Sequence, residues 1–338
     1  MDRSEQQPKG QLEVPHVQPL LNDVQKTVTL SAQLERVKMG WALPNGNPVH
    51  ELEELDAMFV DQGLPTDFVD TAARQLFEQP HVLENINFQS SLLTGGSQFF
   101  GAVLRKMGEL AEQDPQLAEG AALPVKIRLV EHYRRGGNES EMQRFAREVE
   151  DELQERVDRN DPLALGQLAK VRYEQSMFEF AQDKFESSMA VGEESIQLCA
   201  RAGDTYGVLA ARGNTAGLCR YTLAKKRGEH PDNEHLLNEG KTLLLSDLAI
   251  AQKKMKLTEA GSSQHRNFTR VEMNNAAHLM QIANLQNDLS AARGAMEILK
   301  QNPVFQSAFD PEHPGDYAHA QEWVRPYPEI LRRLEELE

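Results

Sequence analysis

The sequence predicts an all-α protein built from pairs of antiparallel helices. Apolar residues recur at intervals of three and four along most of the 338 residues, the spacing of one helix face. Short clusters of Pro, Gly, Asn and Asp separate these segments, as expected of turns. Between residues 165 and 185, large and small apolar side chains are spaced as two antiparallel helices joined by a tight turn would require: Leu165, Leu168, Ala169, Phe178, Ala181 and Phe185.

The first 160 residues divide into a tail and a helical region. Residues 1–16 are polar and contain two prolines, so we expect a disordered tail that lacks the apolar surface needed to offset ordering entropy. Residues 17–160 are expected to form an N-terminal helical region, because its apolar segments begin at N-cap residues or prolines and end at glycines or prolines. The expected helices span residues 19–38, 48–62, 67–79, 97–113, 125–135 and 139–159.

The junction Asn160-Asp161-Pro162 has three helix-boundary signals in succession. Asn160 suits the left-handed residue that follows a helix, Asp161 suits the cap of the next helix, and Pro162 suits its first turn. We interpret this junction as a corner within one array of helices rather than as a border between two domains.

Residues 161–304 resemble tetratricopeptide repeats (TPRs), hairpins of roughly 34 residues in which large residues of one helix fill spaces beside small residues of its partner. The first hairpin matches at the six residues between 165 and 185 named above. It departs from the family pattern at Arg172, Ser188 and Glu193, where an aromatic residue, an alanine and a proline are usual.

Two further hairpins can be proposed from the same resemblance. One runs from Tyr206 to Lys256, with a loop at 228–233 that is longer than the family allows. The other runs from Val271 to Leu299, with its turn near Asn287 and Asp288. The resemblance implies a TPR-like α-solenoid, because such units bury their apolar faces mainly against their neighbours. Residues 305–338 are expected to form a loop and a C-terminal capping helix; the alternative is a tail that docks into another protein's groove.

Composition disfavours several classes of partner. Asp and Glu number 52 against 36 Lys and Arg, a formal net charge of −16 that repels nucleic acid and anionic lipid. No apolar run is long enough to insert into a membrane, and the first residues lack the apolar core of a signal peptide, so we expect a cytoplasmic protein. Cys199 and Cys219 each lie in an apolar helical pattern, which favours small buried thiols over a disulfide.

No catalytic, cofactor or metal motif stands out in the sequence. His230 and His235 bracket Asp232, and His313 and His319 bracket Asp316, but neither group has the fixed spacing of a helical zinc motif. The pair Gly95-Gly96 precedes a helix without the strand or the Gly-Lys-Ser/Thr sequence of a phosphate loop, so we interpret it as a turn.

We therefore expect a non-enzymatic interaction scaffold or adaptor that binds a peptide or helix of a partner protein in a concave groove. The TPR resemblance implies that first-helix residues line this groove, and the charge favours a basic or neutral partner. The same side chains equally fit ordinary solvent-facing positions. The candidate residues are Lys170, Tyr173, Glu174, Asn214, Arg220, Asn274, Asn275 and His278, among which Asn and Arg suit a peptide backbone or carboxylate.

Two alternatives remain. One is an all-helical enzyme or ligand sensor with a pocket between the N-terminal helices and the repeats. A closed pocket with converging His, Asp or Glu would favour it, whereas an open groove lined by Asn, Arg, Tyr and Lys would favour the scaffold. The other is a regulator with an N-terminal DNA-binding module, which the acidic balance disfavours. The sequence does not specify the oligomeric state.

Overall fold

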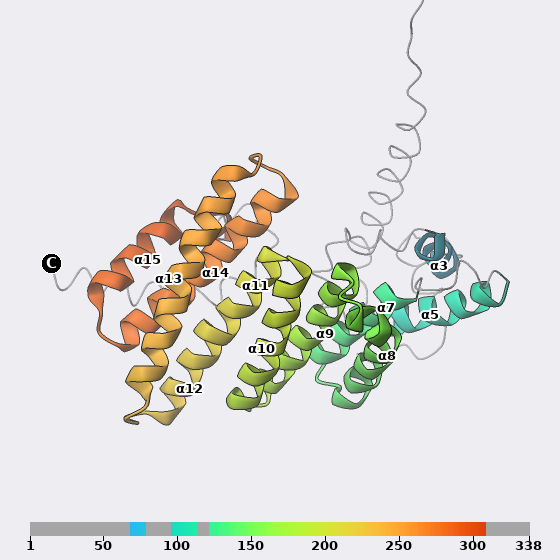
Figure 1. Cartoon of the computed structure of the whole chain (residues 1–338), viewed down its shortest axis with the longest axis horizontal. Helices are drawn as coiled ribbons and strands as arrows, with labels where there is room; N and C mark the ends of the chain where they lie inside the picture. The colour runs from blue at the N-terminus through green and yellow to red at the C-terminus, as the bar shows by residue number, and fades with distance from the viewer. Residues whose placement is uncertain (1–67, 79–95, 114–121, 309–338) are drawn as a thin grey trace, which may run out of the picture. The chain divides into compact units, whose positions relative to one another are not determined.

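The structure, a computed structural model, describes residues 68–78, 96–113 and 122–308. Within these ranges most residues are helical and none is in a strand, so the all-α prediction is confirmed (Figure 1). The predicted tail at 1–16, the helices expected at 19–38 and 48–62, and residues 309–338 of the expected loop and capping helix lie outside the described residues. Residues 305–308, expected in that loop, are helical.

The chain divides into two compact units, Met1–Val125 and Lys126–Glu338. In the first unit, α3 (Phe68–Glu78) packs against α5 (Gly96–Gln113) through buried apolar side chains such as Val69 and Met107. The helix α7 (Leu123–Arg135) contains the point of division. The division therefore falls about 35 residues before the junction at Asn160, which lies inside the second unit.

The helices of the second unit pack against their neighbours in the sequence. Helix α9 contacts α8 and α10, α10 contacts α11, and α14 contacts α13 and α15 (Figure 1). In chain order they are α8 (Glu139–Asp158), α9 (Pro162–Ala181), α10 (Phe185–Ala202), α11 (Thr205–Arg212), the π-helix η2 (Gly213–Cys219), α12 (Arg220–Arg227), α13 (Asn233–Leu257), α14 (Ser263–Leu285), α15 (Leu289–Gln301) and α16 (Pro303–Ala308).

The corner between α8 and α9 forms as its sequence predicts. Asn160 adopts a left-handed conformation with φ +58°, which asparagine tolerates better than most residues. The Asp161 carboxylate accepts hydrogen bonds from the backbone N–H groups of Leu163 and Ala164, and Pro162 occupies the first turn. Since α8 and α9 also pack against each other, the junction is a corner between two contacting helices.

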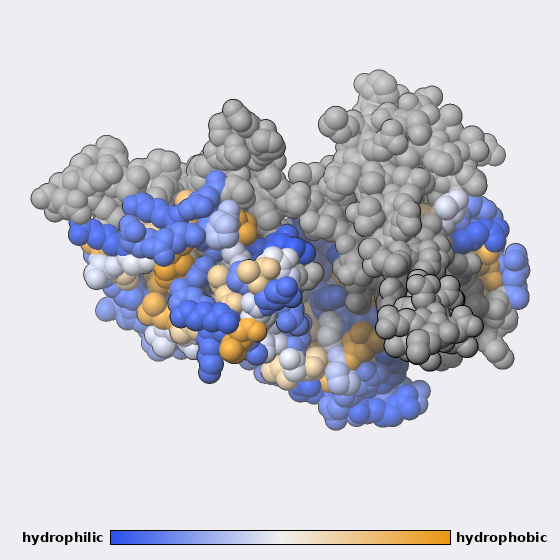
Figure 2. Space-filling model, turned by 90° about the horizontal axis from the view of Figure 1, so that it is seen from above, coloured by the Kyte–Doolittle hydropathy of each residue, from blue (hydrophilic) through white to orange (hydrophobic). Residues whose placement is uncertain are grey.

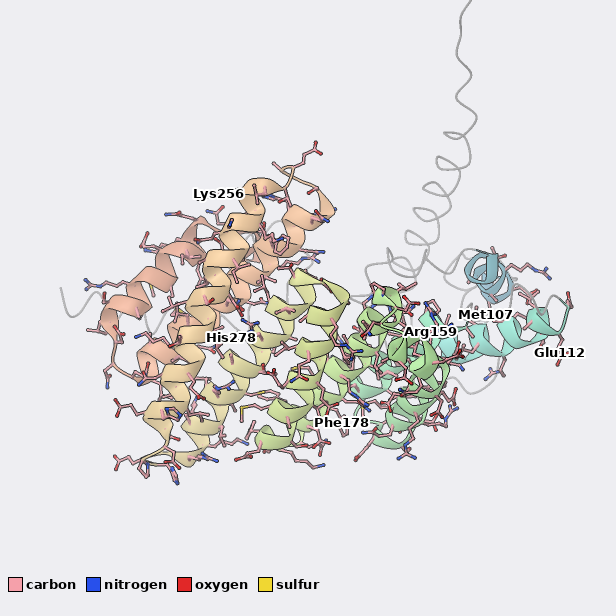
Figure 3. All side chains as sticks on the ribbon, viewed as in Figure 1. Met107, Glu112, Arg159, Phe178, Lys256 and His278 are labelled. Carbon is pink, nitrogen blue, oxygen red and sulfur yellow. The ribbon has the colours of Figure 1, made fainter. Side chains whose placement is uncertain are left out.

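Helices α9 and α10 pack against each other, and the large and small residues at 165–185 are buried, apart from Ala181, which is exposed at the end of α9. Phe178 and Phe185 are only 1% and 3% exposed, and Phe178 is labelled in Figure 3. The Ser188 hydroxyl donates to the backbone oxygen of Ser176, while the Ser176 hydroxyl donates to the backbone oxygen of Ser188. This reciprocal pair satisfies both buried hydroxyls, so serine is accommodated at the contact.

The long helical segment 205–227 is interrupted by η2, where the sequence predicts a regular helix. Side chains satisfy carbonyl groups around this interruption: the Thr215 hydroxyl donates to the oxygens of Ala211 and Arg212, and the Arg220 guanidinium donates to that of Thr215. A π-helix of this kind is found mostly as a short insertion within an α-helix, often at a functional site. Two glycines of this segment, Gly213 and Gly217, lie so close to side chains of α14 that a Cβ atom on either would clash.

We expect Asp288→Ala to lower the free energy of unfolding by about 1 kcal/mol, because Asp288 caps α15. Its carboxylate accepts from the backbone N–H of Ala291 at 3.0 Å and pairs with Lys241 of α13. Urea unfolding followed by circular dichroism measures the change. Asp288→Asn keeps a capping oxygen and should lose less; an equal loss in both variants would show that the cap contributes nothing.

Candidate functional site

The predicted site residues lie on helices that contact one another. Lys170, Tyr173 and Glu174 are on α9, Asn214 is on η2, Arg220 begins α12, and Asn274, Asn275 and His278 are on α14. Helix α11 contacts both α9 and α14, and η2 also contacts α14. The structure therefore brings these residues onto adjacent helices, although their exposure differs widely.

Tyr173 and Asn214 are joined directly across α9 and η2. The Asn214 amide nitrogen donates to the Tyr173 hydroxyl at 2.8 Å and to the backbone oxygen of Ala210 at 3.2 Å. Because a carbonyl oxygen can only accept, the Ala210 contact fixes which end of the Asn214 amide faces it. The other end, the Asn214 side-chain oxygen, is buried without a hydrogen-bond partner. Burial raises the pKa of Tyr173, so its hydroxyl stays neutral.

Glu174 forms an ion pair with Arg134 of α7, a residue that sequence analysis did not select. Glu174 is 9% exposed, and its burial raises the pKa of the carboxyl although Arg134 opposes the shift. One turn away, Glu131 accepts from Arg128 and Arg135, each at 2.9 Å. The sequence showed Arg134 only as a cation in the last turn of a helix; its partner is 40 residues away and is defined by packing.

Asn275 and His278 lie against the glycines of η2 rather than on an open face. Both are 1% exposed. A Cβ atom on Gly213 would lie 2.2 Å from the Asn275 side-chain oxygen, and one on Gly217 would lie 2.7 Å from the His278 Cβ. Figure 3 labels His278. Burial lowers the pKa of His278 to about 4, so this imidazole is neutral near pH 7. Glycine permits the close approach of the two helices.

The other three candidates differ in their surroundings. Arg220 donates to the backbone oxygen of Thr215 in its own segment at 3.0 Å, and it lies 3.8 Å from Glu239 of α13. Asn274 is half-buried. Lys170 is exposed and forms no ion pair with any residue that the structure describes. Of the eight candidates, Lys170 is therefore the exposed one and Tyr173, Arg220 and Asn274 are half-buried, whereas Glu174, Asn214, Asn275 and His278 are buried.

A buried ion pair beside η2 was missed in the sequence. Asp247 of α13 has a fully buried side chain, and one of its oxygens accepts from Arg212 at 3.0 Å. Its other oxygen is buried without a hydrogen-bond partner. Burial raises the pKa of Asp247 to about 6, while Arg212 opposes the shift. In the sequence Asp247 interrupts an apolar segment, a signal that could have identified it.

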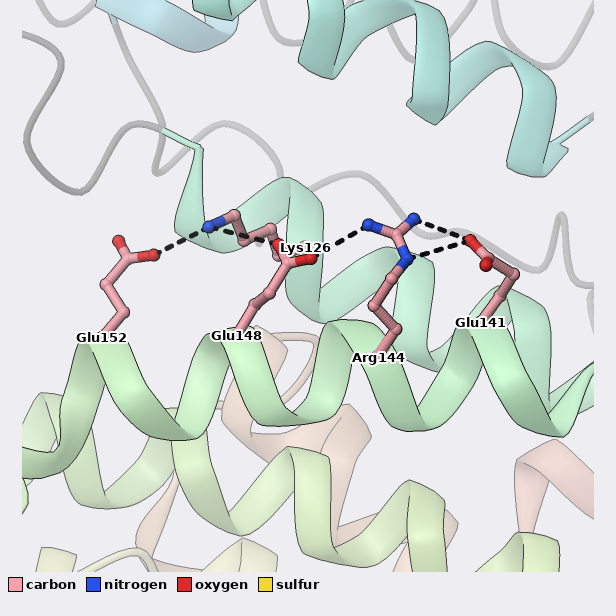
Figure 4. A network of polar contacts seen from close by, with 5 residues as sticks. All are labelled: Lys126, Glu141, Arg144, Glu148 and Glu152. Carbon is pink, nitrogen blue, oxygen red and sulfur yellow. Dashed lines mark hydrogen bonds and ion pairs between the residues drawn. The ribbon is translucent and has the colours of Figure 1, made fainter.

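The polar face of α8 contains a shallow hollow and a network of ion pairs. The Arg144 guanidinium donates to Glu141 and Glu148, and Lys126 lies 3.1 Å from Glu152 and 3.5 Å from Glu148 (Figure 4). The hollow is lined by Glu139, Ser140, Gln143, Arg144, Arg147, Glu148 and Asp151. Since several of these charges pair with one another at a solvated surface, they form no evident acid–base or nucleophilic arrangement.

The histidines and cysteines considered for chemistry also have ordinary surroundings. His230 lies 3.7 Å from Asp232, whereas His235 lies 3.4 Å from Glu239; the two histidines have different partners. Within 68–78, 96–113 and 122–308, no three His, Cys, Asp or Glu side chains gather as a metal site. The group at 313–319 lies outside the described residues. Cys199 and Cys219 are buried, and burial raises the pKa of Cys199 to about 11.

Among the described helices, none combines the length and apolar character needed to cross a membrane. No protein-family model matches the chain, and no curated protein or solved structure matches it either.

Proposed function

We propose that the chain is a non-enzymatic scaffold that binds a peptide or helix of a partner protein. In this proposal α9 with α10, the segment 205–227 with α13, and α14 with α15 form three antiparallel, TPR-like hairpins stacked as a solenoid. The first helix of each hairpin lines a concave groove that receives the partner. A basic or neutral partner is favoured because the chain carries a formal net charge of −16.

The observation that carries this proposal is the order of contacts between helices. Short connections join α9 to α10 and α14 to α15, the longer segment 228–232 joins α12 to α13, and the members of each pair pack against each other. The first helices also contact one another in sequence, α9 with α11 and α11 with α14. A row of first helices is the arrangement that a continuous groove requires.

Within this row, Tyr173 is the side chain best suited to anchor a peptide. Its hydroxyl is held by Asn214, so little conformational freedom would be lost when a partner packs against the ring. Lys170 lies one turn earlier on α9 and supplies an exposed charge at the edge of the same surface. The two residues combine a rigid aromatic contact with an adaptable polar one.

The proposal is tested by affinity capture with the immobilised full-length protein and proteins from its natural source. We expect Tyr173→Ala to weaken capture of one prominent partner by about thirtyfold, the effect of losing an aromatic anchor. Lys170→Glu should weaken capture if the contacting surface of the partner is acidic and strengthen it if that surface is basic, so the sign of the change reports the partner's charge. The captured partner is identified by mass spectrometry and its affinity then measured by calorimetry.

The matched control is Lys300→Glu, a charge reversal at an exposed position on α15. This variant should bind as the wild type does, and circular dichroism should show that all variants remain folded. Tyr173→Phe, which keeps the ring, should retain most of the binding. Undiminished capture by Tyr173→Ala, or equal loss in Lys300→Glu, would contradict the proposal.

A further inference from the structure

Helix α13 carries an apolar stripe whose C-terminal end its own packing leaves uncovered. Leu236, Leu243, Ile250 and Leu257 recur every seven residues along α13. A seven-residue period drifts by about 20° per heptad around a straight helix, so such a stripe gradually leaves a fixed buried face. Leu236 and Leu243 are half-buried, whereas Ile250 is 36% exposed and Leu257 is 73% exposed.

Apart from Ile250 and Leu257, the exposed large apolar side chains of the described residues are scattered. On the face shown in Figure 2, hydrophobic residues form small separate spots among hydrophilic ones. The exposed large apolar side chains are Leu163, Leu245, Ile250, Leu257 and Leu285. Of these, Ile250 and Leu257 share one helix face, because residues seven apart lie nearly above each other. Their shared face distinguishes this pair from isolated surface leucines.

Lysines flank this exposed pair. Lys253 and Lys254 lie between Ile250 and Leu257 at helical spacings of three and four, and Lys256 precedes Leu257 near the end of α13 (Figure 3). None of the three lysines forms an ion pair with a described residue. Among other exposed cations of the same unit, Arg144, Lys226 and Arg227 are paired with acids, whereas Lys170 stands without an ion pair to a described residue. The C-terminal half of α13 is thus locally basic in an acidic chain.

The geometry points to a docking surface for an acidic amphipathic helix, formed by Ile250, Lys253, Lys254, Lys256 and Leu257. Two apolar side chains seven residues apart match the knob spacing that a second helix can receive, and the lysines complement glutamate or aspartate beside its apolar face. A bilayer would require no such spacing, so a helix is favoured over a lipid surface. This surface is separate from the groove residues of α9, η2 and α14.

The test uses the full-length protein and a fluorescein-labelled synthetic helix of about 18 residues, with leucines on one face and glutamates on the other. Fluorescence anisotropy should detect binding that weakens as salt is added. Leu257→Asp and the double variant Lys253→Glu/Lys254→Glu should each weaken binding by about tenfold or more. Leu163→Asp changes an exposed leucine on α9 and should have no effect.

Several results would overturn the inference. The first is that the glutamate peptide does not bind. The second is that a peptide with lysine in place of glutamate binds as tightly as the glutamate peptide. The third is that Leu163→Asp weakens peptide binding as much as Leu257→Asp does. Two parallel measurements identify other occupants. Sedimentation with phosphatidylserine vesicles that depends on Leu257, without peptide binding, would assign the face to lipid. Dimerisation in sedimentation equilibrium that Leu257→Asp abolishes, without peptide binding, would assign it to a second copy of the chain.

Discussion

Gly240→Ala is expected to lower the free energy of unfolding by about 2 kcal/mol, although alanine normally stabilises a helix relative to glycine. Gly240 lies within α13 and is buried against η2. A Cβ atom placed there would lie 2.4 Å from the backbone oxygen of Ala216. Because this neighbour is backbone, the two helices must separate to admit the methyl group, and separation loses packing on both sides.

Gly294→Ala is the matched control. Gly294 lies within α15, and no atom outside its local helix would lie within 4 Å of a Cβ there. Alanine should therefore stabilise the protein by up to about 1 kcal/mol through helix propensity alone. Urea unfolding of both variants measures the difference. If Gly240→Ala were as stable as Gly294→Ala, the close contact between α13 and η2 would be absent in solution.

Arg212→Ala is expected to destabilise the protein by about 3 to 5 kcal/mol at pH 8, because it leaves a buried carboxylate without its partner. Asp247 is fully buried and already has one oxygen without a hydrogen bond. At pH 5 the loss should be smaller, since the Asp247 carboxyl can then take up a proton and avoid burying a charge. The unfolding free energy at the two pH values measures this difference.

The wild-type protein should itself show a pH dependence at Asp247. Its pKa is raised from 3.8 to about 6, so the folded state holds this proton more tightly than the unfolded state does. This group's contribution to stability is therefore greatest below pH 4 and falls by about 3 kcal/mol as the pH rises above 6. Asp247→Asn removes the titration, so the difference between the two unfolding curves against pH isolates it.

Two variants test whether the stability lost in Arg212→Ala comes from breaking the buried ion pair or from removing a positive charge. Arg144→Ala removes a half-exposed arginine from the α8 network and should cost less than about 1 kcal/mol. Arg212→Ala combined with Asp247→Asn should recover part of the stability lost in Arg212→Ala, because no charge remains buried. No recovery, together with no pH dependence in Arg212→Ala, would show that Arg212 acts through packing alone.

Local signals predicted the helix boundaries well where they were strong. The Asn160-Asp161-Pro162 corner and the turn at Asn287 and Asp288 form as expected, because caps and left-handed residues depend on a few neighbouring atoms. The burial of Phe178 and Phe185 also follows from periodicity. The tail and the capping helix lie outside the described residues, so both stay predictions.

The candidate site was predicted less completely. Sequence analysis selected Tyr173 and Asn214 separately, and the structure joins them by a hydrogen bond across two helices. It missed Arg134 and the pair of Arg212 with Asp247, whose partners are 40 and 35 residues away. It also selected Asn275 and His278, which are buried against glycines of η2. A polar residue on a helical pattern does not reveal which neighbour will cover it.

By itself the sequence determined the helical class, the caps and the apolar faces, because these depend on periodicity and on contacts within a few residues. Only the tertiary structure decided which polar side chains are buried, which charges are paired, and where a π-helix replaces the regular one. Those outcomes depend on how closely two helices approach, and at Gly213, Gly217 and Gly240 that approach is set by the fit of atoms distant in the chain.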